Sequence, residues 1–128
     1  MTNDAIQKKC EDYGKYEYGN KVSLEDFNRY LEKTRPDLNF SLNLQPLLKN
    51  MAIDAVKSVF FKLDPFKRVN SFELFGLDFM VDEDGKPWLI EINANPCLEI
   101  SCSVLNRIIP ALVENIWKVA IDPIYPPP

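Results

Sequence analysis

Residues 72–93 decide the fold, and they read FELFGLDFMVDEDGKPWLIEIN. Two apolar runs flank Asp84-Gly85, a dipeptide that strongly favours a hairpin turn between two antiparallel strands. A turn of two or four residues centred there sets three apolar pairs on one face: Leu77 with Ile92, Phe79 with Ile90, and Val81 with Trp88. The stretch therefore predicts a β-hairpin whose apolar face belongs in a core.

The same register sets two acidic residues opposite each other on the other face. Asp78 faces Glu91, and Asn93 follows one step further along that face. Like charges on Cβ atoms about 5 Å apart repel by about 3 kcal/mol at an effective dielectric of about 20. Two carboxylates and an amide oxygen suit a hard divalent cation such as Mg²⁺, which would relieve the repulsion. The alternative is a solvated polar face with a protonated or splayed pair.

Composition bounds the class of protein. The chain has 128 residues, is 46% hydrophobic and 27% charged, and fits one soluble globular domain. Its three cysteines, Cys10, Cys97 and Cys102, are sparse and lack C-x-x-C spacing, which indicates free thiols in a reducing compartment rather than a zinc site. The sequence contains no histidine, so imidazole bases and histidine-ligated zinc are excluded for this chain.

Charge is distributed unevenly along the chain. Residues 1–70 carry 12 basic and 10 acidic side chains, and residues 71–128 carry 3 basic and 9 acidic ones, giving formal charges of +2 and −6. An acidic second half argues against nucleic acid as the main partner and fits a cation site better. No apolar run approaches the roughly 20 residues that cross a bilayer, so we expect no membrane partner.

Three helices are expected around the hairpin. Residues 24–33 follow Ser23, which resembles the start of a capping box, and their buried stripe is Leu24, Phe27 and Leu31. Residues 42–63 carry apolar side chains at three- and four-residue steps, and we expect them to form core: Leu44, Leu47, Leu48, Met51, Ala52, Ala55, Val56, Val59 and Phe60. Residues 103–120 form the last helix, which Pro110 should kink. Residues 1–8 show no helix or strand of their own, although Met1-Thr2-Asn3 could end a strand.

One hairpin is too little sheet to be stable alone, and its unpaired edges require more strands. We therefore expect an α+β fold in which residues 1–128 are the C-terminal part of a larger domain. Poor solubility of the isolated chain follows from the same reasoning.

Several motifs in order resemble the tubulin–tyrosine ligase family. They are Thr2-Asn3-Asp4-Ala5-Ile6-Gln7-Lys8, Asp12-Tyr13-Gly14-Lys15-Tyr16-Glu17, residues 72–82 and residues 88–93. The match in order and spacing covers nearly the whole chain. The resemblance implies an ATP-grasp fold and an ATP-dependent ligase that joins an amino acid to tubulin tails, in the cytoplasm at the cytoskeleton or cilium.

Carried over residue by residue, the resemblance implies roles for six positions. Asp78, Glu91 and Asn93 match the family's magnesium ligands, which hold the phosphates of ATP and are the expected catalytic residues. Thr2 and Asn3 match a nucleotide-contacting segment, and Ile90 matches an apolar residue near the adenine. The alternatives are a satisfied strand end for Thr2 and Asn3, and ordinary hairpin core for Ile90.

The resemblance also implies what the 128 residues lack. The family's adenine-holding segment, its lysine-bearing phosphate loop and the arginines at the acyl phosphate precede the matched part. We therefore expect weak ATP binding and no turnover from this chain alone. Tyrosine and glutamate both remain open as the transferred amino acid, and so does the alternative of a non-catalytic remnant that binds tubulin or another partner. A generic metal-binding or structural domain is the third possibility.

Overall fold

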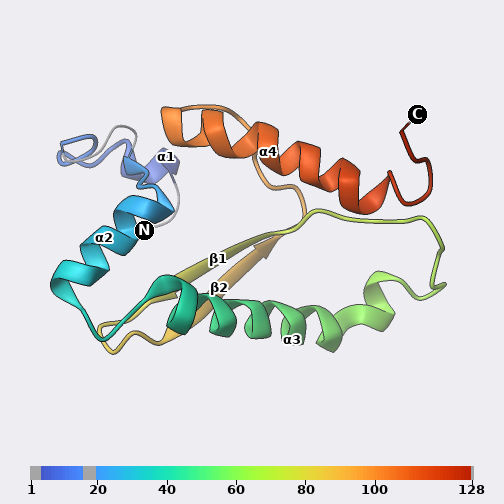
Figure 1. Ribbon diagram of the computed structural model, residues 1–128, viewed down its shortest axis with the longest axis horizontal. Coiled ribbons are helices and arrows are strands. Elements are labelled where there is room, and N and C mark those ends of the chain that lie inside the picture. The colour runs from blue at the N-terminus through green and yellow to red at the C-terminus, as the bar shows by residue number, and fades with distance from the viewer. Residues whose placement is uncertain (1–3, 16–19, 128) are drawn as a thin grey trace. The chain divides into compact units, whose positions relative to one another are not determined.

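The computed structural model describes residues 4–15 and 20–127. In these ranges the elements are α1 (Asp4–Gln7), α2 (Leu24–Thr34), the π-helical turn η2 (Phe40–Leu44), α3 (Gln45–Leu63), β1 (Gly76–Val81), β2 (Pro87–Asn93) and α4 (Ser103–Ala120) (Figure 1). The two strands form one antiparallel sheet. The fold is therefore α+β, as the sequence predicts. No helix among these residues is both long enough and apolar enough to span a membrane.

The chain divides into two compact units, which we describe separately. One unit comprises Met1–Leu24 and Cys97–Pro128, and the other comprises Glu25–Pro96. The second unit holds nearly all of α2, all of η2 and α3, and the complete hairpin. It therefore contains every candidate site residue except Thr2 and Asn3, which lie outside the described residues.

Helix boundaries agree with the sequence patterns with two exceptions. The predicted helices at 24–33 and 103–120 are confirmed as α2 and α4, and α4 continues through Pro110. The expectation that residues 1–8 contain no helix is wrong, because Asp4–Gln7 form the single turn α1. The predicted helix at 42–63 begins differently, as a π-helical turn that passes into α3.

Asn39 caps the π-helical turn that precedes α3. Its side chain accepts a hydrogen bond from the backbone N–H of Leu42 (3.0 Å), and its own N–H donates to the Asn43 side chain (2.7 Å). These bonds satisfy backbone donors that the first turn of a helix leaves without partners. Pro46 then occupies the first turn of α3, a position where proline is well tolerated.

The loop of the hairpin has three residues, not two or four. The Asp82 N–H donates to the Lys86 carbonyl (3.0 Å) and the Gly85 N–H donates to the Asp82 carbonyl (3.0 Å), which leaves residues 83–85 as the loop. Gly85 has φ +81°, the left-handed conformation that completes a three-residue hairpin loop and that glycine adopts without strain.

This odd loop length changes the pairing near the turn. Phe79 pairs with Leu89, Met80 with Trp88, and Val81 with Pro87. The predicted pairs Phe79–Ile90 and Val81–Trp88 are therefore wrong. Ile90 has no cross-strand partner and forms a β-bulge, after which the predicted pairs Asp78–Glu91 and Leu77–Ile92 are correct. Gly76, Asp78 and Met80 of β1 thus share one face with Trp88, Glu91 and Asn93 of β2, and we call it the acidic face.

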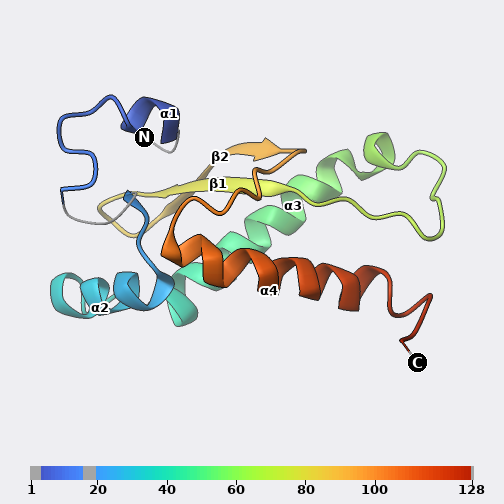
Figure 2. The same ribbon diagram turned by 90° about the horizontal axis from the view of Figure 1, so that it is seen from above.

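Burial is sparse in both units. In the second unit the buried apolar side chains include Leu31, Leu44 and Pro87, and the rings of Phe27 and Phe40 meet edge to face with centroids 6.3 Å apart. The expectation that the apolar stripe of residues 42–63 forms core is correct for Leu44, which is buried in η2, and wrong for its members in α3, none of which is buried. The opposite, apolar face of the hairpin is also only partly covered, with Pro87 buried and Ile92 exposed. A two-stranded sheet offers too little surface to cover a helix of this length, although α3 lies beside it and contacts β2 (Figure 2).

Candidate functional site on the acidic face

The bulge at Ile90 brings the candidate ligands together. The three-residue loop alone would pair Asp78 with Ile90 and Leu77 with Glu91, which would turn Glu91 to the apolar face. One extra residue in β2 shifts the pairing, so that Asp78 faces Glu91 and Gly76 faces Asn93. Bulges commonly re-aim side chains next to active sites in this way. The side chains of Asp78, Glu91 and Asn93 therefore lie on one face, because the bulge at Ile90 offsets the shift in pairing that the three-residue loop causes.

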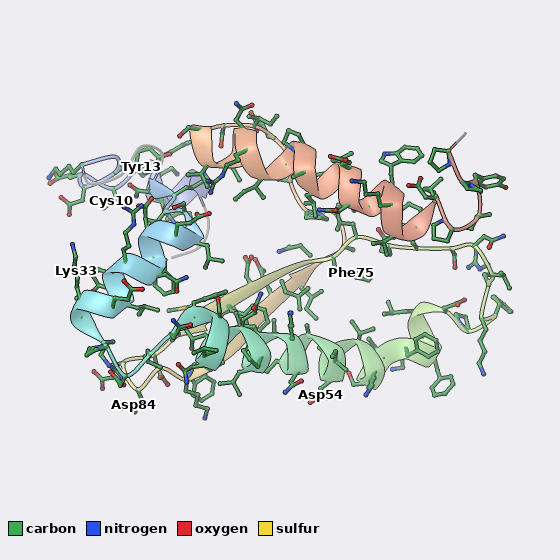
Figure 3. All side chains as sticks on the ribbon, in the orientation of Figure 1. Cys10, Tyr13, Lys33, Asp54, Phe75 and Asp84 are labelled. Carbon is green, nitrogen blue, oxygen red and sulfur yellow. The ribbon has the colours of Figure 1, made fainter. Side chains whose placement is uncertain are left out.

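The predicted site residues of the hairpin differ in their position on the strands and in their exposure to solvent. Ile90 is exposed and sits at the bulge, so it is neither cross-strand partner nor buried core. Asp78 and Asn93 are half-buried, and Glu91 is exposed. Figure 3 labels Phe75, which directly precedes β1, and Asp84, which lies in the loop after β1. Asp78 belongs to β1, between these two residues in sequence.

The loop of the hairpin contacts the segment that follows α2 through a hydrogen bond and through apolar packing. The Arg35 guanidinium donates to both carboxylate oxygens of Asp37 (3.0 and 2.8 Å) and to the backbone carbonyl of Glu83. This pairing raises the pKa of Arg35 and lowers the pKa of Asp37 through their mutual hydrogen bonds. Gly85 is buried against Leu38, whose methyl carbons would lie 2.7 Å from an added Cβ. Nothing in the local spacing of the sequence links position 35 to position 83, so local patterns do not predict this contact.

Asp82 holds the loop from within the hairpin. Its carboxylate accepts hydrogen bonds from the Trp88 indole N–H (2.8 Å) and from the backbone N–H groups of Lys86 (2.8 Å) and Asp84 (3.1 Å). These donors, the indole first, hold the pKa of the Asp82 carboxyl below its ordinary value of 3.8. The Lys86 ammonium lies 4.1 Å from the centre of the Trp88 ring, a cation–π geometry. Contacts from the segment after α2 and contacts from Asp82 within the hairpin therefore both hold the loop at three residues, and the loop length sets the strand pairing.

The far end of the acidic face is closed by a different contact. A Cβ added at Gly76 would lie 3.0 Å from Cβ of Pro96 and 3.8 Å from Cβ of Asn93. Pro96 therefore takes the space that a side chain at position 76 would fill. A glycine in a predicted strand is a recognised signal of such close approach, and Gly76 is the sequence feature from which this contact could have been predicted.

The donor set of the acidic face fits a hard cation. Two carboxylates and one amide carbonyl are oxygen ligands of the kind that Mg²⁺ takes, usually alongside waters and substrate phosphates. Within residues 4–15 and 20–127, no group of three or more histidine, cysteine or acidic residues is placed to hold a metal ion. Asp78, Glu91 and Asn93 would thus form a partial ligand set, with two acidic members.

Comparisons with known proteins define the family. The model of the tubulin-tyrosine ligase family matches residues 1–127. Tubulin glycylase 3B of Tetrahymena thermophila is 36% identical over 126 residues, which cover 95% of this chain and 10% of that protein. The chain belongs to the tubulin-tyrosine ligase family, which confirms the resemblance seen in its motifs.

Two further relatives carry other names. A protein polyglycylase of Rattus norvegicus is 33% identical over 132 residues, covering 95% of this chain and 19% of that protein. A probable alpha-tubulin polyglutamylase of Tetrahymena thermophila is 33% identical over 121 residues, covering 94% of this chain and 28% of that protein. The chain therefore spans between about a tenth and three tenths of the length of these three relatives.

Proposed function

We propose that the protein containing this chain is an ATP-dependent ligase that attaches an amino acid to tubulin. The observation that carries the proposal is the direct pairing of Asp78 with Glu91 on the face that also bears Asn93. Family membership supports it, as do the names of the relatives, which describe glycylation and glutamylation of tubulin or protein. We further propose an ATP-grasp fold for the complete domain.

The proposed chemistry needs no side-chain nucleophile. A substrate carboxylate attacks the γ-phosphorus of ATP, forms an acyl phosphate and releases ADP. The amine of the second substrate then attacks the acyl carbon, and inorganic phosphate leaves as the amide bond forms. Such phosphoryl transfer depends mainly on positioning and on charge neutralisation, so the absence of histidine is no obstacle.

The residues of the acidic face would serve the first step. Asp78, Glu91 and Asn93 would hold Mg²⁺, which when bound neutralises charge on the phosphates of ATP. In this role Asp78 and Glu91 would each supply carboxylate oxygens, and Asn93 would add an amide oxygen. Ile90, exposed beside Glu91, would contribute apolar surface near the adenine, and Thr2 and Asn3 would contact the nucleotide.

The relatives widen the choice of transferred amino acid. The motifs of this chain leave tyrosine and glutamate open, and the names of several relatives add glycine. We propose glycine or glutamate before tyrosine, because these are the additions that the relatives' names describe. The proposed partners are accordingly tubulin or microtubules and a free amino acid.

The test is an incorporation assay on the full-length protein with tubulin, ATP, Mg²⁺ and radiolabelled glycine, glutamate or tyrosine. We expect ATP-dependent label in tubulin that Glu91→Gln abolishes while the variant stays folded. Glu83→Gln is the matched control, since it makes the same chemical change in the loop of the same hairpin, outside the paired residues. Full activity of Glu91→Gln would refute the proposal. Pelleting with microtubules without any ATP-dependent product would favour the non-catalytic alternative instead.

A further inference from the structure

Gly76 is the first residue of β1 and the cross-strand partner of Asn93. It lies two residues before Asp78, so a side chain at position 76 would point to the acidic face. The nearest atom to that missing side chain is Cβ of Pro96, at 3.0 Å, a separation tighter than ordinary packing. The proline ring therefore lies over the acidic face at its Asn93 end.

Pro96 is joined to Asn93 by only two residues, Ala94 and Asn95. Proline fixes its own φ and restricts the residue before it to extended conformations, so this short connection is stiff. Pro96 is also half-buried. A displacement of the ring would consequently be transmitted to the backbone of Asn93 rather than absorbed by a flexible side chain.

We propose that Gly76 is a positioning residue for Asn93. By leaving room for Pro96 above the acidic face, Gly76 lets the chain fold back after β2 and holds the Asn93 amide where it completes the oxygen set. This inference rests on the cation site of the proposed function. It adds Gly76 and Pro96, neither of which binds the cation, to the residues that the site requires.

The test measures binding of Mn²⁺ in the presence of ATP by electron paramagnetic resonance, on the full-length protein. We expect Gly76→Ala to raise the Kd of Mn²⁺ about tenfold, the lower end of the effect of residues that orient metal ligands. The melting temperature should fall only by what the contact with Pro96 costs, because alanine is otherwise no worse than glycine in a strand. Gly14→Ala is the control: it places the same alanine at a glycine with nothing within 4 Å of its added Cβ, and it should leave the Kd of the folded protein unchanged.

A double substitution separates positioning from general damage. Pro96→Gly removes the atom that an alanine at position 76 would strike, so Gly76→Ala should cause no further loss in that background. Equal losses in both backgrounds, or an unchanged Kd in Gly76→Ala, would overturn the inference. If Gly76→Ala does not fold, Pro96→Gly alone carries the test and should raise the Kd, and an unchanged Kd overturns the inference.

Asp78→Asn and Asn93→Ala distinguish this inference from the proposed function. We expect both to weaken Mn²⁺ binding. If neither does, the cation site itself is refuted, and the role of Gly76 with it. If both do and Gly76→Ala does not, only the role of Gly76 is refuted.

Discussion

Asp78 of β1 lies directly opposite Glu91 of β2, although the three-residue loop of the hairpin would by itself set Asp78 opposite Ile90. The bulge at Ile90 shifts the strand pairing by one residue and so offsets the shift caused by the three-residue loop. Two like charges are thereby held on neighbouring strands, an arrangement that costs free energy in the absence of a cation.

The first prediction concerns that repulsion. Without divalent cations, Asp78→Asn should stabilise the protein by about 0.2–1 kcal/mol, the range for a cross-strand pair. This is below the roughly 3 kcal/mol expected from Coulomb's law at an effective dielectric of about 20, because Glu91 is exposed and solvent screens the pair. The same substitution should abolish the stabilisation that Mn²⁺ gives to the wild type. Urea unfolding with EDTA and with Mn²⁺ measures both effects. Asp54 is exposed on α3 and is labelled in Figure 3. Asp54→Asn is therefore the control, and it should change neither the stability in EDTA nor the stabilisation by Mn²⁺. Destabilisation by Asp78→Asn in EDTA would contradict the assignment of a repulsive pair.

The second prediction compares two glycines that both have positive φ. Gly85→Ala should destabilise the protein by about 2–4 kcal/mol, because left-handed strain of about 1–2 kcal/mol adds to the clash with Leu38. Gly14→Ala should cost only the strain, since nothing lies within 4 Å of its added Cβ. Urea unfolding of the two variants is the measurement. Equal costs would show that the packing of Gly85 against Leu38 contributes nothing.

The third prediction concerns acid. The pKa of Asp82 is lowered in the folded protein, so its contribution to stability is complete above 3.8 and is lost as the pH falls below that value. The free energy of unfolding should therefore decrease as the pH falls through this range. The decrease should be less steep in Asp82→Asn. Asp37, whose pKa is lowered by Arg35, and Glu114, whose pKa is lowered by Lys118, account for part of the remaining slope. Trp88 fluorescence in a Trp117→Phe background reports on the loop, and identical slopes in both proteins would exclude a role for Asp82.

The fourth prediction concerns the exposed apolar segment after α3. Phe66 and Val69 are 79% and 86% exposed, and Phe61 nearby is 73% exposed. Exposed apolar patches of this kind promote association. The 128-residue chain should self-associate as its concentration rises, and Phe66→Ser with Val69→Ser should reduce this in sedimentation velocity experiments. Lys62→Ser with Lys57→Ser, which alters the charge of α3 but not its apolar surface, is the control. A monodisperse wild-type monomer at all concentrations would contradict the prediction.

Much of the fold follows from local patterns. The α+β class, the helices α2 and α4, and the hairpin around Asp84-Gly85 were all predictable from periodicity and turn residues. The pairing of Asp78 with Glu91 was predicted correctly, but from a loop length that is wrong and without the bulge. The core role of α3 was not correctly predicted, because an apolar stripe shows what a helix can bury and not whether a partner covers it.

The sequence by itself predicted the candidate site residues, and its motifs indicated the family to which the chain belongs. Only the tertiary structure decided how the hairpin closes. Loops of two, three and four residues all suit Asp84-Gly85 locally, and the choice falls to three because Arg35 holds the Glu83 carbonyl and Leu38 packs on Gly85. These contacts join residues 47 or more positions apart in sequence, so no local pattern contains them. The bulge at Ile90 then restores the acidic pair, since strand pairing must satisfy both the fixed loop and the alternation of the two faces.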